Sequence, residues 1–486
     1  MPKTEYILTV GIETHVQLKT KSKLFSGSDN DSKDSVANTL INHIDFGLPG
    51  ALPVLNEKAI ELASKAAFAL NSKPSYFSKF DRKHYFYPDL PMGYQISQYD
   101  QPIIVGGYVE FYCNDQLRRV NITRAHLESD AGKSIHPDNQ NYSLVDLNRA
   151  GTPLLEIVSE PEMHSPEEAK AYAHELYLLM RYADVSEANL YYGNMRFDVN
   201  VSISKDNQLG TRTETKNLNS FRSIERAITY EMNRQIDLIE SGQQVIQETR
   251  GWNDTKGQGY SMRSKENADD YRYMPDPDLP PILLDDQYIL KIQQSMPKLP
   301  KYWRQQVSKH SLSTSIIESL IEAEIEYSLN NLDYLVNLPT NQARVIANWL
   351  VNIELPLRKK LAESAKNIEL SDKNIQQIYN QVYSIFESGE ISSTNIKLLI
   401  SQLLTMKKLP KDVKEVAKES KLLQTSDEGL LNDIVDQVLA NNPQAVKDLK
   451  EGKDKAIGFL VGQVMKGSKG QANPTIVTTL IKSKIG

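Results

Sequence analysis

An alternation of apolar and polar residues near the amino terminus constrains the fold more than any other feature of this chain. Within residues 7–18, apolar side chains recur at alternate positions, namely Leu8, Val10, Ile12, Val16 and Leu18. Because strand side chains alternate between two faces, Glu13 and His15 project together on the opposite face. The segment predicts a strand with one packed face and one polar face on which a site could be built.

The alternation recurs in three later segments, 120–128, 195–203 and 212–216, where polar side chains collect on one face. In the first segment, the apolar residues Val120 and Ile122 occupy even-numbered positions, as the polar residues do. The polar residues are Arg124, His126 and Glu128, then Arg196, Asp198, Asn200 and Ser202, then Arg212, Glu214 and Lys216. Such strands predict an antiparallel sheet that packs on one side and lines a cavity on the other.

Length and composition limit the class of protein. A chain of 486 residues, 40% hydrophobic and 24% charged, can form two or three domains with large cores. It has no run of about 18 apolar residues and no charged-then-apolar leader, so we expect no membrane span, no secretory signal and a cytoplasmic location. The single cysteine, Cys113, excludes an intrachain disulfide and any multi-cysteine zinc cluster.

Changes in pattern along the chain divide it into three expected regions of an α+β fold. Residues 1–294 combine the antiparallel sheet, arranged as a cradle, with a few helices. One helix should begin after Ser165, a suitable N-cap residue, and a second should begin near Ser220. Few strand signals follow, so we expect an all-α helical domain over residues 295–405 and an all-α tail over residues 406–486.

The carboxy-terminal region is locally basic, although the net charge of the whole chain is −6. Its lysines include Lys453, Lys455, Lys466 and Lys469. A basic module on an acidic body favours contact with a phosphate backbone. Charge alone supports a solvated helix face equally well, and both interpretations stay open at this point.

No phosphate-loop, dinucleotide-binding or HExxH motif is present, so the candidate chemistry rests on carboxylates and histidines of the strand faces. These residues are Glu13, His15, His126, Glu128, Glu156 and Glu214. Converging carboxylates repel one another unless a cation holds them, and oxygen ligands favour Mg²⁺ or Mn²⁺. His15 is expected to bind such an ion directly or through water, or to orient a carboxylate. Any one glutamate alone is more often a surface or ion-paired residue, and for His126 a packing role is as well supported as a site role.

Basic and aromatic side chains cluster in loops that could clamp phosphate charge and stack on a base. Two long loops, 80–102 and 252–281, carry most of them. The candidates are Arg82, Lys83, Tyr85, Arg149, Arg263 and Arg272. Guanidinium groups offer bidentate hydrogen bonds and aromatic rings offer stacking surfaces. For the aromatic residues, packing within the loops is the competing interpretation.

Several long segments of the chain together resemble one known family, the B subunits of the aspartyl/glutamyl-tRNA amidotransferases. The segments are VGIETHVQLKTKSKLFSGS, FDRKHYFYPDLPMGYQISQYDQPI, HLESDAGKS, YSLVDLNRAGTPLLEIVSEP, KNLNSF, QETRGW, DDYRYMPDPDLPP and, in the tail, GKDKAIGFLVGQVMKGSKGQANP. The resemblance covers nearly the full length. It implies a glutamine-synthetase-like cradle and a tail that binds tRNA, with Lys453, Lys455, Lys466 and Lys469 as its candidate contacts.

The resemblance also implies a reaction, in which ATP phosphorylates the side-chain carboxylate of misacylated Glu-tRNA(Gln) or Asp-tRNA(Asn) and ammonia displaces the phosphate. The enzyme is then a ligase that forms a carbon–nitrogen bond with glutamine as amido donor, and it uses Mg²⁺. Its implied partners are a glutaminase A subunit and a small C subunit, which complete a heterotrimer. The sequence does not decide between the two tRNA substrates.

The same resemblance assigns roles to individual residues. It implies that Glu13, His15, Glu128 and Glu214 surround the catalytic metal, with Glu156 a weaker candidate nearby. Position 129 is left out of the ligand set, because Ser129 stands where relatives usually carry glutamate.

A second departure from the family concerns zinc. Many relatives carry a cysteine pair and a further cysteine where this chain has Asn42, Asp45 and Phe197. We therefore predict no structural zinc.

Two functions of other classes compete with the ligase. One is a non-catalytic scaffold that binds tRNA, in which the strand-face carboxylates only pair with the basic loops. The other is a metal-dependent hydrolase of an unrelated substrate. Replacement of Glu13 or Glu128 discriminates between the ligase and the scaffold, because only the ligase needs those carboxylates for catalysis.

Overall fold

The computed structural model describes residues 6–137, 139–206, 208–264, 271–424, 428–451, 455–468 and 472–485. The chain divides into two compact units, Met1–Pro300 and Lys301–Gly486. Among these described residues, every strand lies in the first unit, and the second unit is helical. The predicted organisation, a sheet-containing N-terminal domain followed by a helical region, is confirmed for the described residues.

A large sheet forms the frame of the first unit, in the order β14-β13-β12-β11-β1-β10-β7-β5, with β6 also paired to β7. The strands are β1 Ile7–Gln17, β5 Ile104–Val105, β6 Tyr108–Cys113, β7 Gln116–Ser129, β10 Pro153–Ser159, β11 Met195–Ser204, β12 Thr213–Leu218, β13 Glu248–Asn253 and β14 Gln258–Ser264. The pairs are antiparallel as expected, except that β12 and β13 are parallel. The connection between these two contains a helix, and such a crossover returns the chain in the same direction.

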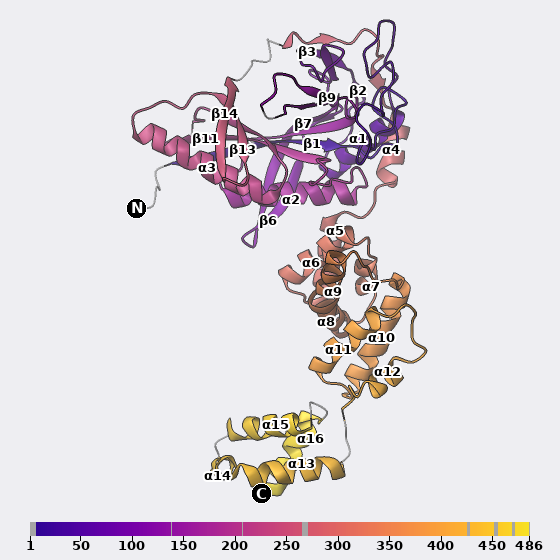
Figure 1. Ribbon diagram of the computed structural model, residues 1–486, viewed down its shortest axis with the longest axis vertical. Coiled ribbons are helices and arrows are strands. Elements are labelled where there is room, and N and C mark those ends of the chain that lie inside the picture. Colours follow the sequence, from indigo (N-terminus) through magenta and orange to yellow (C-terminus); the bar gives the residue numbers. More distant parts are fainter. Residues whose placement is uncertain are drawn as a thin grey trace. The chain divides into compact units, whose positions relative to one another are not determined.

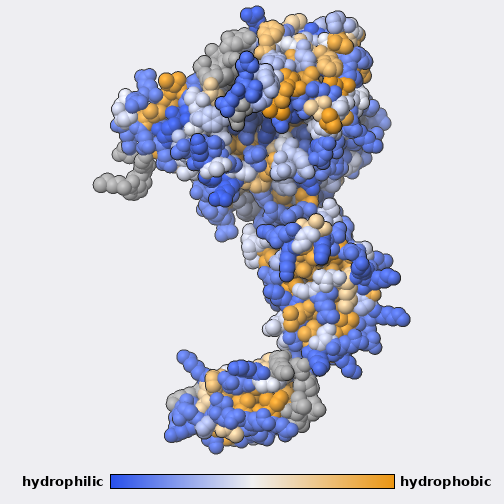
Figure 2. All heavy atoms as spheres, in the orientation of Figure 1, coloured by the Kyte–Doolittle hydropathy of each residue, from blue (hydrophilic) through white to orange (hydrophobic). Residues whose placement is uncertain are grey.

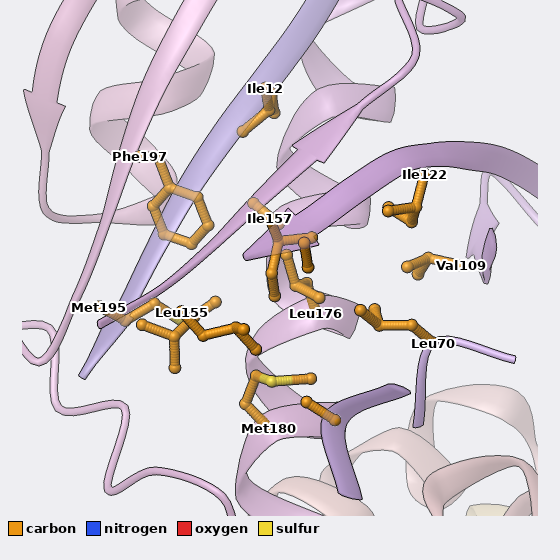
Figure 3. Close-up of a cluster of buried hydrophobic side chains, with 14 of the residues drawn as sticks. Ile12, Leu70, Val109, Ile122, Leu155, Ile157, Leu176, Met180, Met195 and Phe197 are labelled. Atoms are coloured by element: carbon orange, nitrogen blue, oxygen red, sulfur yellow. The ribbon is translucent and has the colours of Figure 1, made fainter. Parts of the chain in front are cut away.

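Helices cover one face of this sheet (Figure 1). They are α1 Glu57–Ala69, α2 Pro166–Tyr182 and α3 Phe221–Glu240, and α4 Asp286–Gln294 packs against α1. The starts predicted for α2 and α3 are confirmed, because Ser165 accepts a hydrogen bond from the Glu168 N–H and Ser220 from the Ser223 N–H. Leu176 of α2 lies against the apolar face of the sheet (Figure 3).

The strand alternation predicted for β1 and β11 is confirmed. Ile12 of β1 and Phe197 of β11 are at most 1% exposed and belong to the core between sheet and helices (Figure 3). Because the side-chain period is two, the intervening polar residues of both strands point to the face without these helices. The sheet thereby separates a packed side from a side available for a site.

A bulge changes the alternation within β7. Val120 and Ile122 are core residues, although they share the parity of His126 and Glu128. The pairing with β10 shifts register there, so that one extra residue, Thr123, enters β7. Such an insertion exchanges the two faces of a strand. His126 and Glu128 consequently lie on the polar face of the sheet.

Three small sheets complete the first unit. They comprise β3 Asp81–His84 with β4 Tyr94–Ser97 and β15 Met274–Pro275, β2 Phe77–Ser78 with β16 Ile282–Leu283, and β8 Lys133–Ile135 with β9 Leu144–Asp146. Figure 1 shows β3 and β9 on the side of the main sheet opposite α2 and α3. Of these short elements, β3, β4, β8 and β9 supply residues to the polar side, namely Lys83, Gln95, Lys133 and Asp146.

The second unit continues as a series of helices. They are α5 Pro300–Val307, η2 Ser308–His310, α6 Thr314–Glu326, α7 Asn331–Val336, α8 Thr340–Trp349, η3 Leu350–Glu354, α9 Leu355–Glu363, α10 Asp372–Glu387, α11 Ser393–Leu404, α12 Val413–Glu419, α13 Glu428–Asn441, α14 Pro443–Lys450, α15 Lys455–Gly467 and α16 Pro474–Ile485. Helix α12 stays with α10, because the Val413 N–H donates to Oε1 of Gln381. The last four helices share a core that includes Leu431, Leu460 and Val477. The predicted boundary between the helical domain, residues 295–405, and the tail, residues 406–486, stays a prediction.

Two surface properties bear on function. Among the described residues, no helix combines the length and apolar character needed to cross a bilayer. Figure 2 shows apolar residues at the surface of the first unit around β2. Large apolar side chains exposed in this part of the chain include Phe46, Leu48, Tyr76, Phe77 and Leu283.

Candidate active site

A cavity of about 820 Å³ opens on the polar side of the main sheet. Six of the residues predicted for the site line it, namely His15, Lys83, Tyr85, Glu128, Arg149 and Glu156. They come from β1, from β3 and the residues that follow it, from β7 and β10, and from the loop between β9 and β10. Cavities of several hundred cubic ångströms with convergent polar groups are typical of ligand sites.

Strand register places three of the polar side chains in one row across the sheet. His15 of β1 is the Cα partner of Glu156 of β10, which is in turn the partner of His126 of β7. Oε2 of Glu156 lies 3.5 Å from Nε2 of His15 and 3.5 Å from Nε2 of His126. Glu128 is next but one to His126, and its Oε1 lies 3.7 Å from Nε2 of His15. Two carboxylates and two imidazoles therefore converge, and three of these residues, His15, Glu128 and Glu156, line the cavity floor.

The charges of this row support one another. Burial opposes a charged imidazole, but the hydrogen bond and the negative charge of Glu156 raise the pKa of His15 to about 9. Burial likewise opposes the charged form of Glu156, but His126 and His15 hold the pKa of this carboxyl well below its usual range. These shifts favour a charged pair of His15 and Glu156, and a cation that bound the imidazole of His15 would have to displace its proton.

A second acidic group lies beside the first on the same face. Glu13 of β1 is the Cα partner of Asp198 of β11, and Glu214 of β12 comes from the next strand. Lys216 is the counter-charge, since its Nζ lies 2.8 Å from Asp198 Oδ2 and 3.0 Å from Glu214 Oε1. Asn200 Nδ2 donates to Glu13 at 3.0 Å.

Glu13 is the least compensated carboxylate of this second group. Burial, followed by repulsion from Glu156 and Glu214, raises its pKa. Its side chain borders a separate, smaller cavity of about 150 Å³ that Arg212 also lines. An additional cation near Glu13 would relieve the repulsion.

The residues fit a divalent cation at either acidic group. One ligand atom from each of His15, Glu128 and Glu156 lies within 4.8 Å of the others, and the same holds for Glu13, Asp198 and Glu214. Ligand atoms about 2.1 Å from an octahedral Mg²⁺ lie about 3.0 to 4.2 Å from one another. The distances of 3.7 and 3.5 Å from Nε2 of His15 to Glu128 Oε1 and Glu156 Oε2 fall in this range. The buried Nδ1 of His15 also makes no hydrogen bond within the described chain.

The structure distributes the four expected metal ligands over these two groups rather than around one point. His15 and Glu128 lie in the first group, and Glu13 and Glu214 lie in the second. Asp198 joins the second group, although no role was expected for it from the sequence. The sequence showed that Asp198 lies on the polar face of its strand. Its position beside Glu13 depends on β11 being the neighbour of β1, which the sequence does not show.

Asp130 is another residue that sequence reasoning missed. Its carboxylate receives Arg196 Nη2 at 3.0 Å and Arg149 Nε at 3.2 Å. Burial opposes its charge, but Arg196 and Arg149 lower the pKa of Asp130. Arg149 also donates to the carbonyl oxygens of Ala131 and Gly132 at 3.1 and 2.7 Å. These contacts fix the Arg149 guanidinium at the cavity.

Side chains alternate between the two faces of β3 and the residue after it, so Lys83 and Tyr85 point to the face opposite Arg82. The Nζ atom of Lys83 lies 4.7 Å from the centre of the Tyr271 ring, and Lys83 and Tyr85 face the cavity. Burial opposes the charge of Lys83, but Tyr273, Glu128 and Glu156 raise its pKa.

Arg82 is engaged elsewhere. Its Nε lies 2.9 Å from Asp276 and its Nη2 lies 2.7 Å from Asp278, so it does not line the cavity. Arg272 is exposed and does not line the cavity either. The side chain of Arg263 lies outside the described residues, and its backbone pairs with Thr249. Arg82, Arg263 and Arg272 therefore gain no support as ligand contacts from the cavity geometry.

Two of the four tail lysines predicted to bind tRNA can be located. Lys455 and Lys466 are exposed near the two ends of α15. Lys453 and Lys469 lie outside the described residues.

A polar cluster occupies the region of Asn42 and Asp45. The Asp45 carboxylate accepts hydrogen bonds from Ser26 Oγ at 2.8 Å and Ser28 Oγ at 2.6 Å, and it lies 3.4 Å from Nζ of the buried Lys23. Asn42 joins through its N–H, which donates to Asp45 at 3.0 Å. Whether the protein lacks structural zinc stays a prediction.

Comparisons with known proteins cover nearly the whole chain. Residues 8–290 match the family described as the GatB/GatE catalytic domain, and residues 333–485 match the family described as the GatB domain.

Individual relatives carry one name, that of the B subunit of an aspartyl/glutamyl-tRNA(Asn/Gln) amidotransferase. The chain is 40% identical to the B subunits of Caldicellulosiruptor bescii and Carboxydothermus hydrogenoformans, over 99% of each chain. It is also 40% identical to the B subunit of Rickettsia bellii, over 100% of this chain and 98% of the relative. The predicted resemblance is confirmed, and the chain belongs to the family of aspartyl/glutamyl-tRNA(Asn/Gln) amidotransferase B subunits.

Proposed function

We propose that this chain activates the side-chain carboxylate of misacylated Glu-tRNA(Gln), Asp-tRNA(Asn) or both with ATP, and amidates it with ammonia. The relatives' names and the family descriptions support this reaction class. The observation that carries the proposal is the group His15, Glu128 and Glu156 on the floor of a large polar cavity, with His126 on the other side of Glu156. The enzyme is a ligase that forms a carbon–nitrogen bond, with glutamine as the amido donor.

The chemistry explains why such a site is needed. A carboxylate does not readily lose oxide, whereas an acyl phosphate has a good leaving group. An oxygen of the side-chain carboxylate attacks the γ-phosphorus of ATP, ADP leaves, and ammonia then displaces phosphate from the acyl carbon. Lys83 and Arg149 line the cavity as cations and would hold phosphate oxygens. The carboxylate cluster as a whole would take up the proton that ammonia releases on attack.

Mg²⁺ is the proposed metal, and it would bind at one or both acidic groups. His15, Glu128 and Glu156 would hold it in the first group, and Glu13, Asp198 and Glu214 in the second. The distances among their ligand atoms and the carboxylate-rich donor set support it. When bound, Mg²⁺ would neutralise charge on the transferring phosphoryl group. The mostly antiparallel sheet with carboxylates on one face also supports a glutamine-synthetase-like cradle, which remains part of the proposal.

Ammonia is proposed to come from a glutaminase A subunit, braced with this chain by a small C subunit in a heterotrimer. An exposed apolar surface on the first unit supports a protein partner. Phe77 and Leu283 are Cα partners in the β2–β16 pair and are 45% and 75% exposed. Exposed apolar patches commonly mark protein interfaces. The proposed setting is the cytoplasm, where charged tRNA is used in translation.

The tail is proposed to bind the tRNA. Exposed Lys455 and Lys466 on α15 support this assignment, because phosphate contacts from lysine supply much of the affinity for nucleic acid. The four terminal helices have their own core, which suits a separate binding module.

The proposal is tested by amide formation in the complex assembled with candidate A and C subunits, on each misacylated tRNA with ATP, Mg²⁺ and glutamine. Glu128→Gln should lower the rate by at least about a hundredfold while tRNA binding is retained. Glu240→Gln, at the exposed end of α3, is the matched control and should keep full activity. An unaltered rate in the Glu128 variant would favour a tRNA-binding scaffold, and hydrolysis without amide product would favour a hydrolase.

A further inference from the structure

The cavity has an aromatic rim that the proposed function leaves unused. Tyr191 and Tyr192 both line it, and they are 88% and 50% exposed. Their ring centroids lie 5.1 Å apart at an interplanar angle of 82°. Nζ of Lys33 lies 5.4 Å from the centre of the Tyr192 ring, and Lys33 lines the same cavity. We call Tyr191, Tyr192 and Lys33 the tyrosine ledge.

The tyrosine ledge is held by backbone contacts rather than by burial of its rings. The Tyr192 N–H donates to Oδ1 of Asn189 at 3.2 Å, and the Asn194 N–H donates to the carbonyl oxygen of Asn189 at 2.9 Å. Gly193 follows with a φ of 72°, which closes the turn. The turn presents both rings to the cavity at a defined place, although most of the Tyr191 surface remains free.

The ledge is also tied to the strand that carries His15. The Gln17 N–H donates to the carbonyl oxygen of Asn194 at 2.7 Å, and Nδ2 of Asn194 donates to Oε1 of Gln17 at 2.8 Å. On the other side, Nε2 of Gln17 donates to the carbonyl oxygen of Asn30 at 3.3 Å, close to Lys33 in the chain. One residue at the end of β1 thus anchors both loops of the ledge, two positions from His15.

The composition of the ledge favours a flat ligand over a phosphate. Lys33 is the one cation of the ledge, and two carboxylates, Asp31 and Asp34, line the cavity beside it, so the local formal charge is negative and disfavours a phosphate. An exposed tyrosine face attracts a planar base by stacking, and aromatic platforms bind nucleobases irrespective of sequence. The proposed reaction brings two adenines to this cavity, that of ATP and that of the 3′-terminal adenosine carrying the amino acid.

We propose that the tyrosine ledge is a stacking site for an adenine base at the mouth of the active-site cavity. The inference rests on the proposed function, because that function supplies the adenine-bearing substrates. The adenine belongs to ATP or to the aminoacylated end of the tRNA. The base stacks on a Tyr191 or Tyr192 ring while the reacting group reaches the floor at His15, Glu128 and Glu156.

Steady-state kinetics of the assembled complex test the proposal with Y191A/Y192A, Y191F/Y192F and wild type. The double alanine variant should raise the KM for either ATP or aminoacyl-tRNA about tenfold or more, which is the range for loss of one stacked base. The substrate whose KM rises is the source of the adenine. The double phenylalanine variant keeps the ring faces and should stay within about twofold of wild type.

A matched control is Tyr112→Ala, since Tyr112 of β6 is also 50% exposed but does not line the cavity. It should leave both KM values unchanged. The proposal is overturned if neither KM rises in Y191A/Y192A, or if Y191F/Y192F is as impaired as the alanine variant. Association with the A and C subunits is measured by size-exclusion chromatography. Its loss in Y191A/Y192A would make the ledge a protein interface and would also overturn the proposal.

A binding measurement separates this proposal from the proposed function. Equilibrium binding of ATP and of a short single-stranded RNA ending in CCA is measured for the full chain without turnover. Y191A/Y192A should weaken one of the two probes about tenfold, even if the wild-type complex forms no amide. Equal binding by wild type and variant for both probes would refute the ledge whatever the complex catalyses.

Discussion

Nε2 of His15 lies 3.5 Å from Oε2 of Glu156, and the two residues are Cα partners across β1 and β10. Register, not loop conformation, therefore sets this contact, and the same register places His126 on the other side of Glu156. A site built on adjacent strands is held more rigidly than one on loops. The catalytic proposal depends on this rigidity.

Glu156→Gln should reduce the kcat of amide formation by at least about a hundredfold, because it removes the negative charge shared by His15 and His126. The amide has nearly the same size, so we expect a thermal midpoint within about 5 °C of wild type. Stopped assays of amide product together with circular dichroism measure both quantities. A fully active variant would show that the charge between the histidines is dispensable.

Lys216→Met tests the second acidic group. It removes the cation that lies between Asp198 and Glu214, so the remaining carboxylates repel one another. With a chelator present, we expect the unfolding free energy to fall by about 1 to 3 kcal/mol. The loss is limited because Lys216 is partly exposed and solvent screens its charge. Added Mg²⁺ should restore more stability to the variant than to wild type in urea unfolding. Equal responses to Mg²⁺ would argue against cation binding at Glu13, Asp198 and Glu214.

Glu324 of α6 should make the stability of the second unit depend on pH. Burial raises the pKa of its carboxyl from 4.5 to about 7, although the N–H groups of Asn331 and Leu332 donate to it. Between about pH 4.5 and 7 the folded protein binds a proton that the unfolded chain lacks. The resulting stabilisation is complete below pH 4.5 and is lost as pH rises through 7, by at most about 3 kcal/mol.

Glu324→Gln is the variant that checks this dependence. The amide oxygen can still accept from the Asn331 and Leu332 N–H groups but cannot ionise. Thermal midpoints measured from pH 5 to 8 should fall less for the variant than for wild type, and the variant should be the more stable at pH 8. Parallel curves would mean that Glu324 titrates normally in the folded protein.

The tail prediction concerns tRNA affinity. Lys455→Glu combined with Lys466→Glu should weaken tRNA binding and lower the slope of log affinity against log salt by about one unit per lysine. Filter binding at several salt concentrations measures both. Lys58→Glu, at an exposed position near the start of α1, is the charge-matched control. Removal of residues 425–486 should weaken binding further, and unchanged affinity after that truncation would place the tRNA contacts elsewhere.

The sequence predicted the faces of β1 and β11 because their alternation is uninterrupted. It could not reveal the bulge at Thr123, which exchanges the faces of β7, because an inserted residue leaves no periodic signal. His126 and Glu128 are on the polar face only through that bulge. The sequence could have distinguished Lys83 from Arg82, because adjacent residues of a strand point to opposite faces. Of these two residues of β3, only Lys83 reaches the cavity.

Residues whose roles depend on strand order were harder to find. Asp198 meets Glu13 and Asp130 meets Arg196 only because segments far apart in sequence become neighbours in the folded chain. Local pattern gives the direction of a side chain and not its partner. The same limit explains why one metal centre was expected from the sequence where the structure has two adjacent acidic groups.

The most direct test of carboxylate activation follows oxygen from substrate to product. Misacylated tRNA is prepared with ¹⁸O in the side-chain carboxylate, and the assembled complex converts it with ATP, Mg²⁺ and glutamine. Transfer through an acyl phosphate predicts one ¹⁸O atom in the inorganic phosphate, detected by mass spectrometry, and loss of this label with Glu128→Gln. Amide product accompanied by unlabelled phosphate would contradict the account.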